Sequence, residues 1–184
     1  MRGMLAIRTF LAMLCAAALT AGCDRSASIP QGVQVYFSPR GGATDAVVSA
    51  FAHATNSILV QAYSFTSTPI AQALVNAKRR GVQVRVLLDS AQRSDKYSEA
   101  DFLKNNDILT LIDARHGIAH NKIAIVDGYL VLTGSFNFTK AAEEKNAENL
   151  LVLNDPVLAK HYLDNWYLHE QHSEVYERAK KDPR

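Results

Sequence analysis

Cysteine is scarce in this chain of 184 residues, and both cysteines lie near its start. They are Cys15 and Cys23, so no disulfide can form within the part of the chain that follows residue 23. Zinc sites made from clusters of cysteines are excluded there for the same reason.

An excess of charge of one sign is also lacking. The chain has 20 basic and 18 acidic residues, and residues 1–22 contain two basic and no acidic ones, so residues 23–184 carry 18 of each sign. Without a net field, a protein does not hold a polyanion over its whole surface, and nucleic-acid binding would need a local basic patch.

No hydrophobic run is long enough to cross a bilayer comfortably. The longest at the start is the 13-residue stretch Thr9–Ala21, which follows Arg2 and Arg8 and ends in small residues. This pattern predicts a secretory signal over residues 1–22 and export to a bacterial periplasm.

The end of this signal allows two processing sites. Residues 19–23 resemble a bacterial lipoprotein box, in which Cys23 would be lipidated and would anchor the chain to a membrane. Thr20 departs from that pattern, where Leu is usual three residues before the Cys. Residues 16–18, all alanine, offer ordinary cleavage instead, and both alternatives stay open.

Strands and helices alternate after a polar linker over residues 23–32. Strands are predicted at 33–37, 57–63, 82–88, 108–112 and 149–153, and helices at 43–54, 68–80, 98–104 and 156–178. This order predicts one α/β domain over residues 33–184, a mixed sheet with helices on both faces.

Two apolar runs joined by Asp127-Gly128 predict a β-hairpin. A two-residue turn would pair Val126 with Tyr129 and, further along, His120 with Ser135. Residues two apart on a strand share a face, so Lys122 and Asn137 would lie beside that pair. An imidazole, a cation and two neutral donors would then converge on a site for a tetrahedral anion such as phosphate.

The spacing of these residues resembles the signature of the phospholipase D superfamily: His-x-Lys-x4-Asp at His120, Lys122 and Asp127, then Gly-Ser-x-Asn at residues 134–137. Residues 62–66, 77–82 and 134–143 look like the small bacterial periplasmic endonuclease of this superfamily. The likeness runs from Val33 to the C-terminal helix.

The resemblance implies roles for the matching residues. His120 would attack phosphorus and form a phosphohistidine, and a second His would protonate the leaving oxygen and then activate water. Lys122 and Asn137 would hold the non-bridging oxygens, with Ser135 donating beside them. Glu148 is the best match for the acidic residue that supports the catalytic His.

Other motif residues invite structural interpretations. Asp127 is expected to act as a turn residue or ion-pair partner, and Gly134 to let backbone pass closely. Arg115 and His116 either contact substrate or are simply solvated.

No metal or other cofactor is expected. His116 and His120 lie four apart, but in a loop that enters a strand, and no His-Glu-x-x-His occurs. Lys122 already supplies the positive charge that a metal would bring.

The resemblance also implies two His-Lys motifs for each active site. No other histidine has a lysine two residues later; these are His53, His116, His161, His169 and His172. The second motif must then come from a second copy, which predicts a homodimer with its active site on the two-fold axis.

Three functions follow, in order of preference. The first is a metal-independent phosphodiesterase that acts as a non-specific endonuclease on DNA, with RNA as an alternative substrate. The second is phospholipase D-type hydrolysis of phospholipid head groups, and the third is a catalytically silent module that binds nucleic acid or lipid.

Overall fold

A computed structural model describes residues 31–178 of the chain. The signal at 1–22, Cys23 and most of the linker lie outside the described residues, so export and lipidation stay predictions. Within residues 31–178, no helix is both long and apolar enough to cross a membrane.

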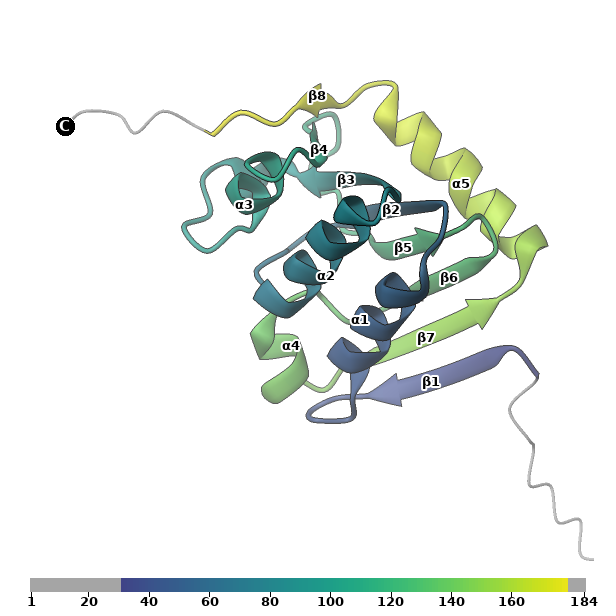
Figure 1. The fold of residues 1–184 in the computed structure, drawn as a ribbon. Coiled ribbons are helices and arrows are strands. Elements are labelled where there is room, and N and C mark those ends of the chain that lie inside the picture. The colour runs from purple at the N-terminus through teal and green to yellow at the C-terminus, as the bar shows by residue number, and fades with distance from the viewer. Residues whose placement is uncertain (1–30, 179–184) are drawn as a thin grey trace, which may run out of the picture.

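The described part of the chain forms a single 8-stranded sheet in the order β1-β7-β6-β5-β2-β3-β4-β8 (Figure 1). Its strands are β1 (Val33–Phe37), β2 (Ser57–Ala62), β3 (Gln83–Asp89), β4 (Leu109–Asp113), β5 (Lys122–Val126), β6 (Leu130–Gly134), β7 (Asn149–Asn154) and β8 (Glu174–Val175). The helices are α1 (Ala43–His53), α2 (Thr68–Arg79), α3 (Ala100–Lys104), α4 (Lys140–Glu144) and α5 (Pro156–Glu170), with a 3-10 turn at Ser90–Arg93.

The sheet is mixed. Strands β2, β3 and β4 are parallel, whereas β5 is antiparallel to β2, and the pairs β5–β6, β6–β7 and β7–β1 are also antiparallel. As a result, β1, β2, β3, β4 and β6 all end at one edge of the sheet, where β5 and β7 begin. We call this the carboxyl edge.

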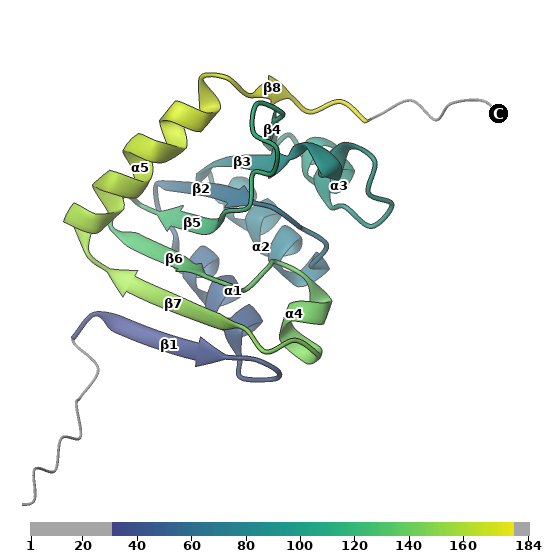
Figure 2. The same cartoon turned by 180° about the vertical axis from the view of Figure 1, so that it is seen from behind.

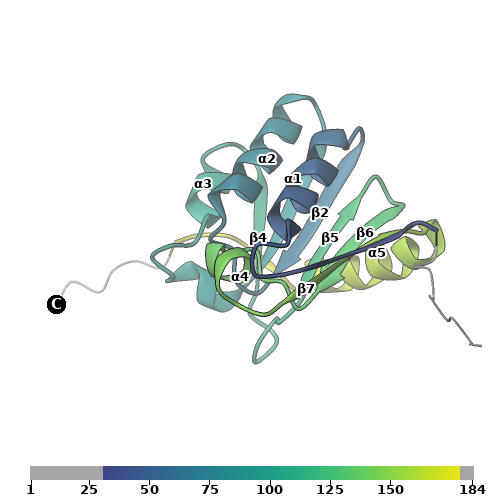
Figure 3. The same cartoon turned by 90° about the horizontal axis from the view of Figure 1, so that it is seen from below.

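Helices cover both faces of the sheet, as Figures 2 and 3 show: α1, α2 and α3 lie on one face, and α5 lies on the other. Strand β2 is buried on both sides because its residues alternate between two cores. Val60 belongs to the large core under α1 and α2, whereas Leu59 packs in a smaller core with Trp166 of α5. Trp166 is 1% exposed and donates from Nε1 to the Val60 carbonyl at 3.0 Å. The predicted α/β class is confirmed.

The C-terminal helix is shorter than predicted. It ends at Glu170 instead of continuing to Arg178, and β8 then pairs with the open edge of β4. Tyr176, which follows β8, is 2% exposed and donates its hydroxyl to Asp101. Burying this ring and covering an edge strand outweigh continued helix formation.

The hairpin register predicted from Asp127-Gly128 is wrong by one residue. Val126 pairs with Leu130 and Ile123 with Thr133, so the loop has three residues and His120 lies ahead of β5, not opposite Ser135. The cause is Asp127, whose backbone N–H still bonds to Ser57 and continues the ladder with β2.

The Asp127 side chain binds the chain segment that enters β2. Its Oδ2 accepts from the backbone and hydroxyl of Thr55, both at 2.9 Å, and its Oδ1 accepts from the backbone of Asn56 and Ser57, both at 2.8 Å. Burial raises the pKa of this carboxyl, but the four hydrogen bonds outweigh burial and hold the pKa below its usual value.

Replacing Asp127 with Asn is therefore expected to lower the free energy of unfolding by about 1–3 kcal/mol at pH 7, since an amide N–H₂ would face the Thr55 donors. Because the folded pKa is depressed, the stabilisation is full above about pH 4 and is lost as pH falls through the folded pKa. Urea denaturation at pH 7 and pH 3 measures both effects.

The exposed Asp164, whose one ion-pair partner within residues 31–178 is Lys160 of the same helix, provides the control. Asp164→Asn should change stability by no more than about 0.5 kcal/mol. Equal stability of Asp127→Asn and the unaltered protein at pH 7 would contradict this role for Asp127.

Candidate active site

The motif residues gather at the carboxyl edge of the sheet. His120 lies two residues before β5, Asn137 follows β6, and Glu148 immediately precedes β7. The antiparallel pairing of β5, β6 and β7 brings these three segments to the same edge.

The segment that carries His120 is fixed by backbone hydrogen bonds on both sides. The N–H of Ala119 donates to Asp89 Oδ2 at 2.7 Å, and the carbonyl of Asn121 accepts from Tyr63 at 2.9 Å. Asp89 is 3% exposed and ends β3, so a buried carboxylate positions the residue before the catalytic candidate.

His120 is exposed, whereas Lys122 is 7% exposed. The Lys122 ammonium donates to the His120 carbonyl at 2.8 Å and lies 5.1 Å from the centre of the Tyr63 ring. The same ring lies 4.5 Å from the His120 imidazole, measured between centroids. Tyr63 thus contacts both residues and restricts their side chains.

Burial lowers the pKa of Lys122, and the negative charge of Glu148 opposes that shift. Glu148 Oε1 accepts from Asn146 at 3.1 Å, and its backbone N–H donates to Ser38 Oγ at 3.2 Å. Within residues 31–178, no hydrogen bond joins Glu148 to His120. The charge of Glu148 acts on Lys122, and its predicted support of His120 stays a prediction.

Ser135 and Asn137 have free hydrogen-bonding capacity. Ser135 Oγ accepts from the backbone and side chain of Asn149 at 3.0 and 3.3 Å, which leaves its own O–H to donate elsewhere. Asn137 Oδ1 is buried and lacks a partner among the described residues. This oxygen is an acceptor and needs a donor to satisfy it, whereas the N–H₂ of the same amide is the group that can donate to a phosphate.

Gly134 lies where β6 passes closest to β7. A Cβ at this position would lie 2.3 Å from the carbonyl oxygen of Asn149, and the residue has φ 149°. Only glycine avoids this clash. The close approach of β6 and β7 that glycine permits also holds Ser135 beside Asn149.

The remaining candidates lie away from this group. Asp127 lies five residues beyond Lys122 along β5, a separation of about 17 Å at the rise of an extended strand. Its role is therefore structural, in the hairpin, and not at the carboxyl edge. His116 turns toward Asp113 at 2.9 Å, and the backbone of Arg115 donates to the same carboxylate at 3.0 Å. His116 thus belongs to a separate group with His169 and His172, which the spacing of the sequence did not suggest.

Comparison with known proteins identifies the family. A family model described as the PLD-like domain of cardiolipin synthase matches residues 47–167. A phospholipase D of Rickettsia typhi is 41% identical over 153 residues, which cover 81% of this chain and 75% of that protein. The chain belongs to the phospholipase D superfamily. The resemblance inferred from the motif is confirmed.

Structural similarity agrees with this membership. Nuc, a phospholipase D family member from Salmonella typhimurium, superposes with a TM-score of 0.75 at 43% identity, covering 79% of this chain and 97% of that one. NucT from Helicobacter pylori shares the fold, with a TM-score of 0.73, 24% identity and coverage of 78% and 98%. As a phospholipase D superfamily member, the protein is a phosphodiester hydrolase.

Gly134→Ala is expected to destabilise the protein by about 1–3 kcal/mol and to lower activity, because β6 must move away from Asn149 and displace Ser135. Thermal unfolding and the rate of phosphodiester hydrolysis are the two measurements. The control is Gly117→Ala, since an added Cβ there meets nothing within 4 Å. Similar effects of the two changes would rule out the close approach as the cause.

Proposed function

We propose that this phospholipase D superfamily member is an endonuclease that cleaves DNA with little sequence preference, with RNA as the alternative nucleic-acid substrate. The supporting observation is an exposed imidazole at the carboxyl edge, whose backbone carbonyl accepts from the buried Lys122 ammonium, with Asn137 following β6 at the same edge. A phosphate in a nucleic-acid backbone can reach such an edge without entering a deep cavity. The extensive similarity to Nuc further supports this choice.

The proposed reaction has two steps. In the first, the His120 imidazole of one copy attacks phosphorus, and the bond to the leaving oxygen breaks as the protonated His120 of a second copy donates its proton. In the second, that neutral imidazole takes a proton from water, and the resulting hydroxide displaces the first imidazole from phosphorus. The proton lost by the second imidazole is regained, so each cycle restores the starting state.

Positive charge and hydrogen-bond donors stabilise the phosphate in both steps. Lys122 and the side-chain N–H₂ of Asn137 would hold the non-bridging oxygens, and the O–H of Ser135 would add a third donor. Lys122 and Ser135 are held by their own hydrogen bonds before substrate arrives, which is the condition for a large electrostatic contribution to rate.

A homodimer supplies the second imidazole in this proposal. The carboxyl edge carries large apolar side chains that are exposed in one copy: Phe37 is 65% exposed where β1 ends, and Ile118 is 59% exposed two residues before His120. A two-fold axis through this edge would bury them and bring two copies of His120 together.

Phospholipids are the second candidate substrate. The Rickettsia typhi relative is named phospholipase D, and a mitochondrial cardiolipin hydrolase of Xenopus laevis is 37% identical over 109 residues, 59% of this chain and 52% of that protein. The proposed chemistry acts on any phosphodiester, so substrate access decides between the two candidates.

Purified protein is expected to nick plasmid DNA in excess chelator and to leave phosphatidylcholine and cardiolipin vesicles intact. His120→Ala should abolish turnover, and Lys122→Ala should slow it on the order of 10²–10³-fold. Gel and phosphate-release assays measure both. If activity is lost in chelator and restored by Mg²⁺ or Zn²⁺, the mechanism is not metal-independent. Hydrolysis of the vesicles but not of DNA would favour the phospholipase. Binding of DNA or lipid without turnover would indicate a catalytically silent module.

Mixed dimers test the shared site. When unaltered and His120→Asn chains are co-expressed equally and pair at random, about a quarter of the dimers contain two unaltered chains. Specific activity per total protein should then fall to about a quarter of the value for the unaltered protein. A mixed dimer has only one His120, so either the nucleophile or the proton donor is missing. A value near one half, with mixed dimers verified by differential tags, would show that each chain carries a complete site.

A further inference from the structure

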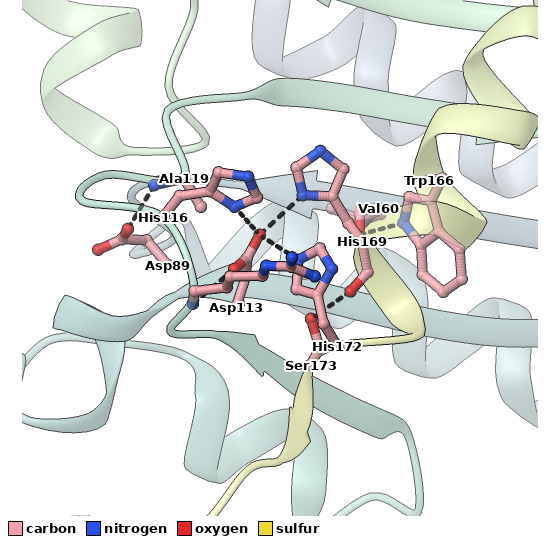
Figure 4. Close-up of polar contacts among 10 residues, drawn as sticks. Val60, Asp89, Asp113, His116, Ala119, Trp166, His169, His172 and Ser173 are labelled. Carbon is pink, nitrogen blue, oxygen red and sulfur yellow. Dashed lines mark hydrogen bonds and ion pairs between the residues drawn. The ribbon is translucent and has the colours of Figure 1, made fainter.

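Four potential metal ligands meet on the α5 face of the sheet, apart from the motif residues. They are Asp113 at the end of β4, His116 in the loop that follows, His169 in the last turn of α5 and His172 just beyond it, and we call them the histidine cluster. One ligand atom from each lies within 4.8 Å of all the others. Figure 4 shows the three imidazoles around the carboxylate.

All three rings point at one oxygen. His169 Nδ1 and His116 Nδ1 lie 2.7 and 2.9 Å from Asp113 Oδ2, and His172 Nε2 lies 3.4 Å from it. Asp113 itself is 0% exposed, and its other oxygen accepts from the backbone of Arg115. A carboxylate oxygen has two lone pairs, so two of these rings already satisfy it.

The third ring remains unsatisfied. His172 Nε2 is buried and lacks a hydrogen-bond partner among the described residues. Buried polar atoms are normally paired, and an unpaired one aimed at other ligand atoms points to a missing partner. Hydrogen bonding within the cluster therefore does not account for its arrangement.

We propose that the histidine cluster binds one Zn²⁺ ion, or a transition ion of similar chemistry. Three imidazoles and one carboxylate form a complete tetrahedral set, and this mixture suits zinc, copper and nickel better than calcium or magnesium. At a Zn–ligand distance of about 2.0 Å, the ligands of a tetrahedron lie about 3.3 Å apart. The three ring nitrogens are already 2.7–3.4 Å from Oδ2.

An ion can reach the cluster from solvent. The His116 side chain is 46% exposed, and those of His169 and His172 are 15% and 19% exposed. They line a shallow pocket together with Asn165 and Gln171. The imidazoles line this pocket, whereas the Asp113 carboxylate that they contact is fully buried.

The bound ion would join parts of the chain that are distant in sequence. His169 and His172 come from the end of α5, just before β8, whereas Asp113 and His116 belong to β4 and the loop that leads to His120. The ion would hold α5 and β8 against this loop and stabilise the fold, without taking part in the reaction. This proposal departs from the expectation, drawn from the sequence, that the chain holds no metal.

Titration of the untagged, metal-free protein with ZnCl₂ tests the site directly. Calorimetry and elemental analysis should find about one Zn²⁺ per chain. Zn²⁺ at about 100 times the dissociation constant favours the folded state about 100-fold, which raises the unfolding temperature by on the order of 5–10 °C.

The His172→Gln variant separates metal binding from folding. Because His172 Nε2 makes no hydrogen bond within residues 31–178 and only a 3.4 Å ion-pair contact with Asp113, this variant should unfold within about 2–4 °C of the unaltered metal-free protein. It should nevertheless bind Zn²⁺ at least about 10-fold more weakly, and the added ion should no longer raise its unfolding temperature.

Two controls exclude other zinc sites. His161→Gln changes an exposed histidine of the same helix, and His120→Asn removes the catalytic candidate; both should still bind one Zn²⁺ with the same thermal shift. Failure to bind Zn²⁺, or equal binding by His172→Gln, would overturn the proposal. Nuclease activity in chelator, assayed well below the unfolding temperature of the metal-free protein, is a separate measurement, so the two proposals can fail independently.

Discussion

Two buried carboxylates at the ends of parallel strands hold the segment that carries His120. Asp89 ends β3 and accepts from the backbone of Ala119, and Asp113 ends β4 and accepts from the backbone of Arg115. A buried carboxylate is unfavourable unless it is fully hydrogen-bonded, so each of them enforces the local chain path. The hydrogen bonds to Asp113 outweigh its burial and hold its pKa well below the usual range. The position of the candidate nucleophile thus depends on charges that do not themselves contact substrate.

The sequence allowed the α/β class and most element positions to be predicted. It also placed His120, Lys122, Ser135 and Asn137 at one end of a hairpin, although through a pairing of His120 with Ser135 that the structure does not have. Alternating apolar residues and fixed motif spacing are local signals, and local signals are sufficient for these features. The hairpin register was missed because it depends on Asp127 remaining bonded to Ser57, a contact across 70 positions. The end of α5 was missed because the driving force is the burial of Tyr176 against a distant edge strand.

The histidine cluster shows the same limit more sharply. His169 and His172 are three residues apart at a helix end, a spacing that on its own predicts little. Their partners Asp113 and His116 lie more than 50 positions earlier, and only the passage of α5 across the sheet brings the pairs together. A search for short metal motifs therefore misses such a site. The structure indicates it because three imidazoles approach one carboxylate oxygen, which can accept hydrogen bonds from only two of them.

Trp166 has a consequence for experiments on this protein. It is the only tryptophan of the chain, and it is buried in the smaller core, bonded to Val60 and 5.2 Å from the Arg85 guanidinium. Its emission therefore reports the α5 layer alone, while the far-ultraviolet circular dichroism signal averages over every helix. Comparing the two signals during one melt reveals whether α5 separates from the sheet before α1 and α2 do, without any added label.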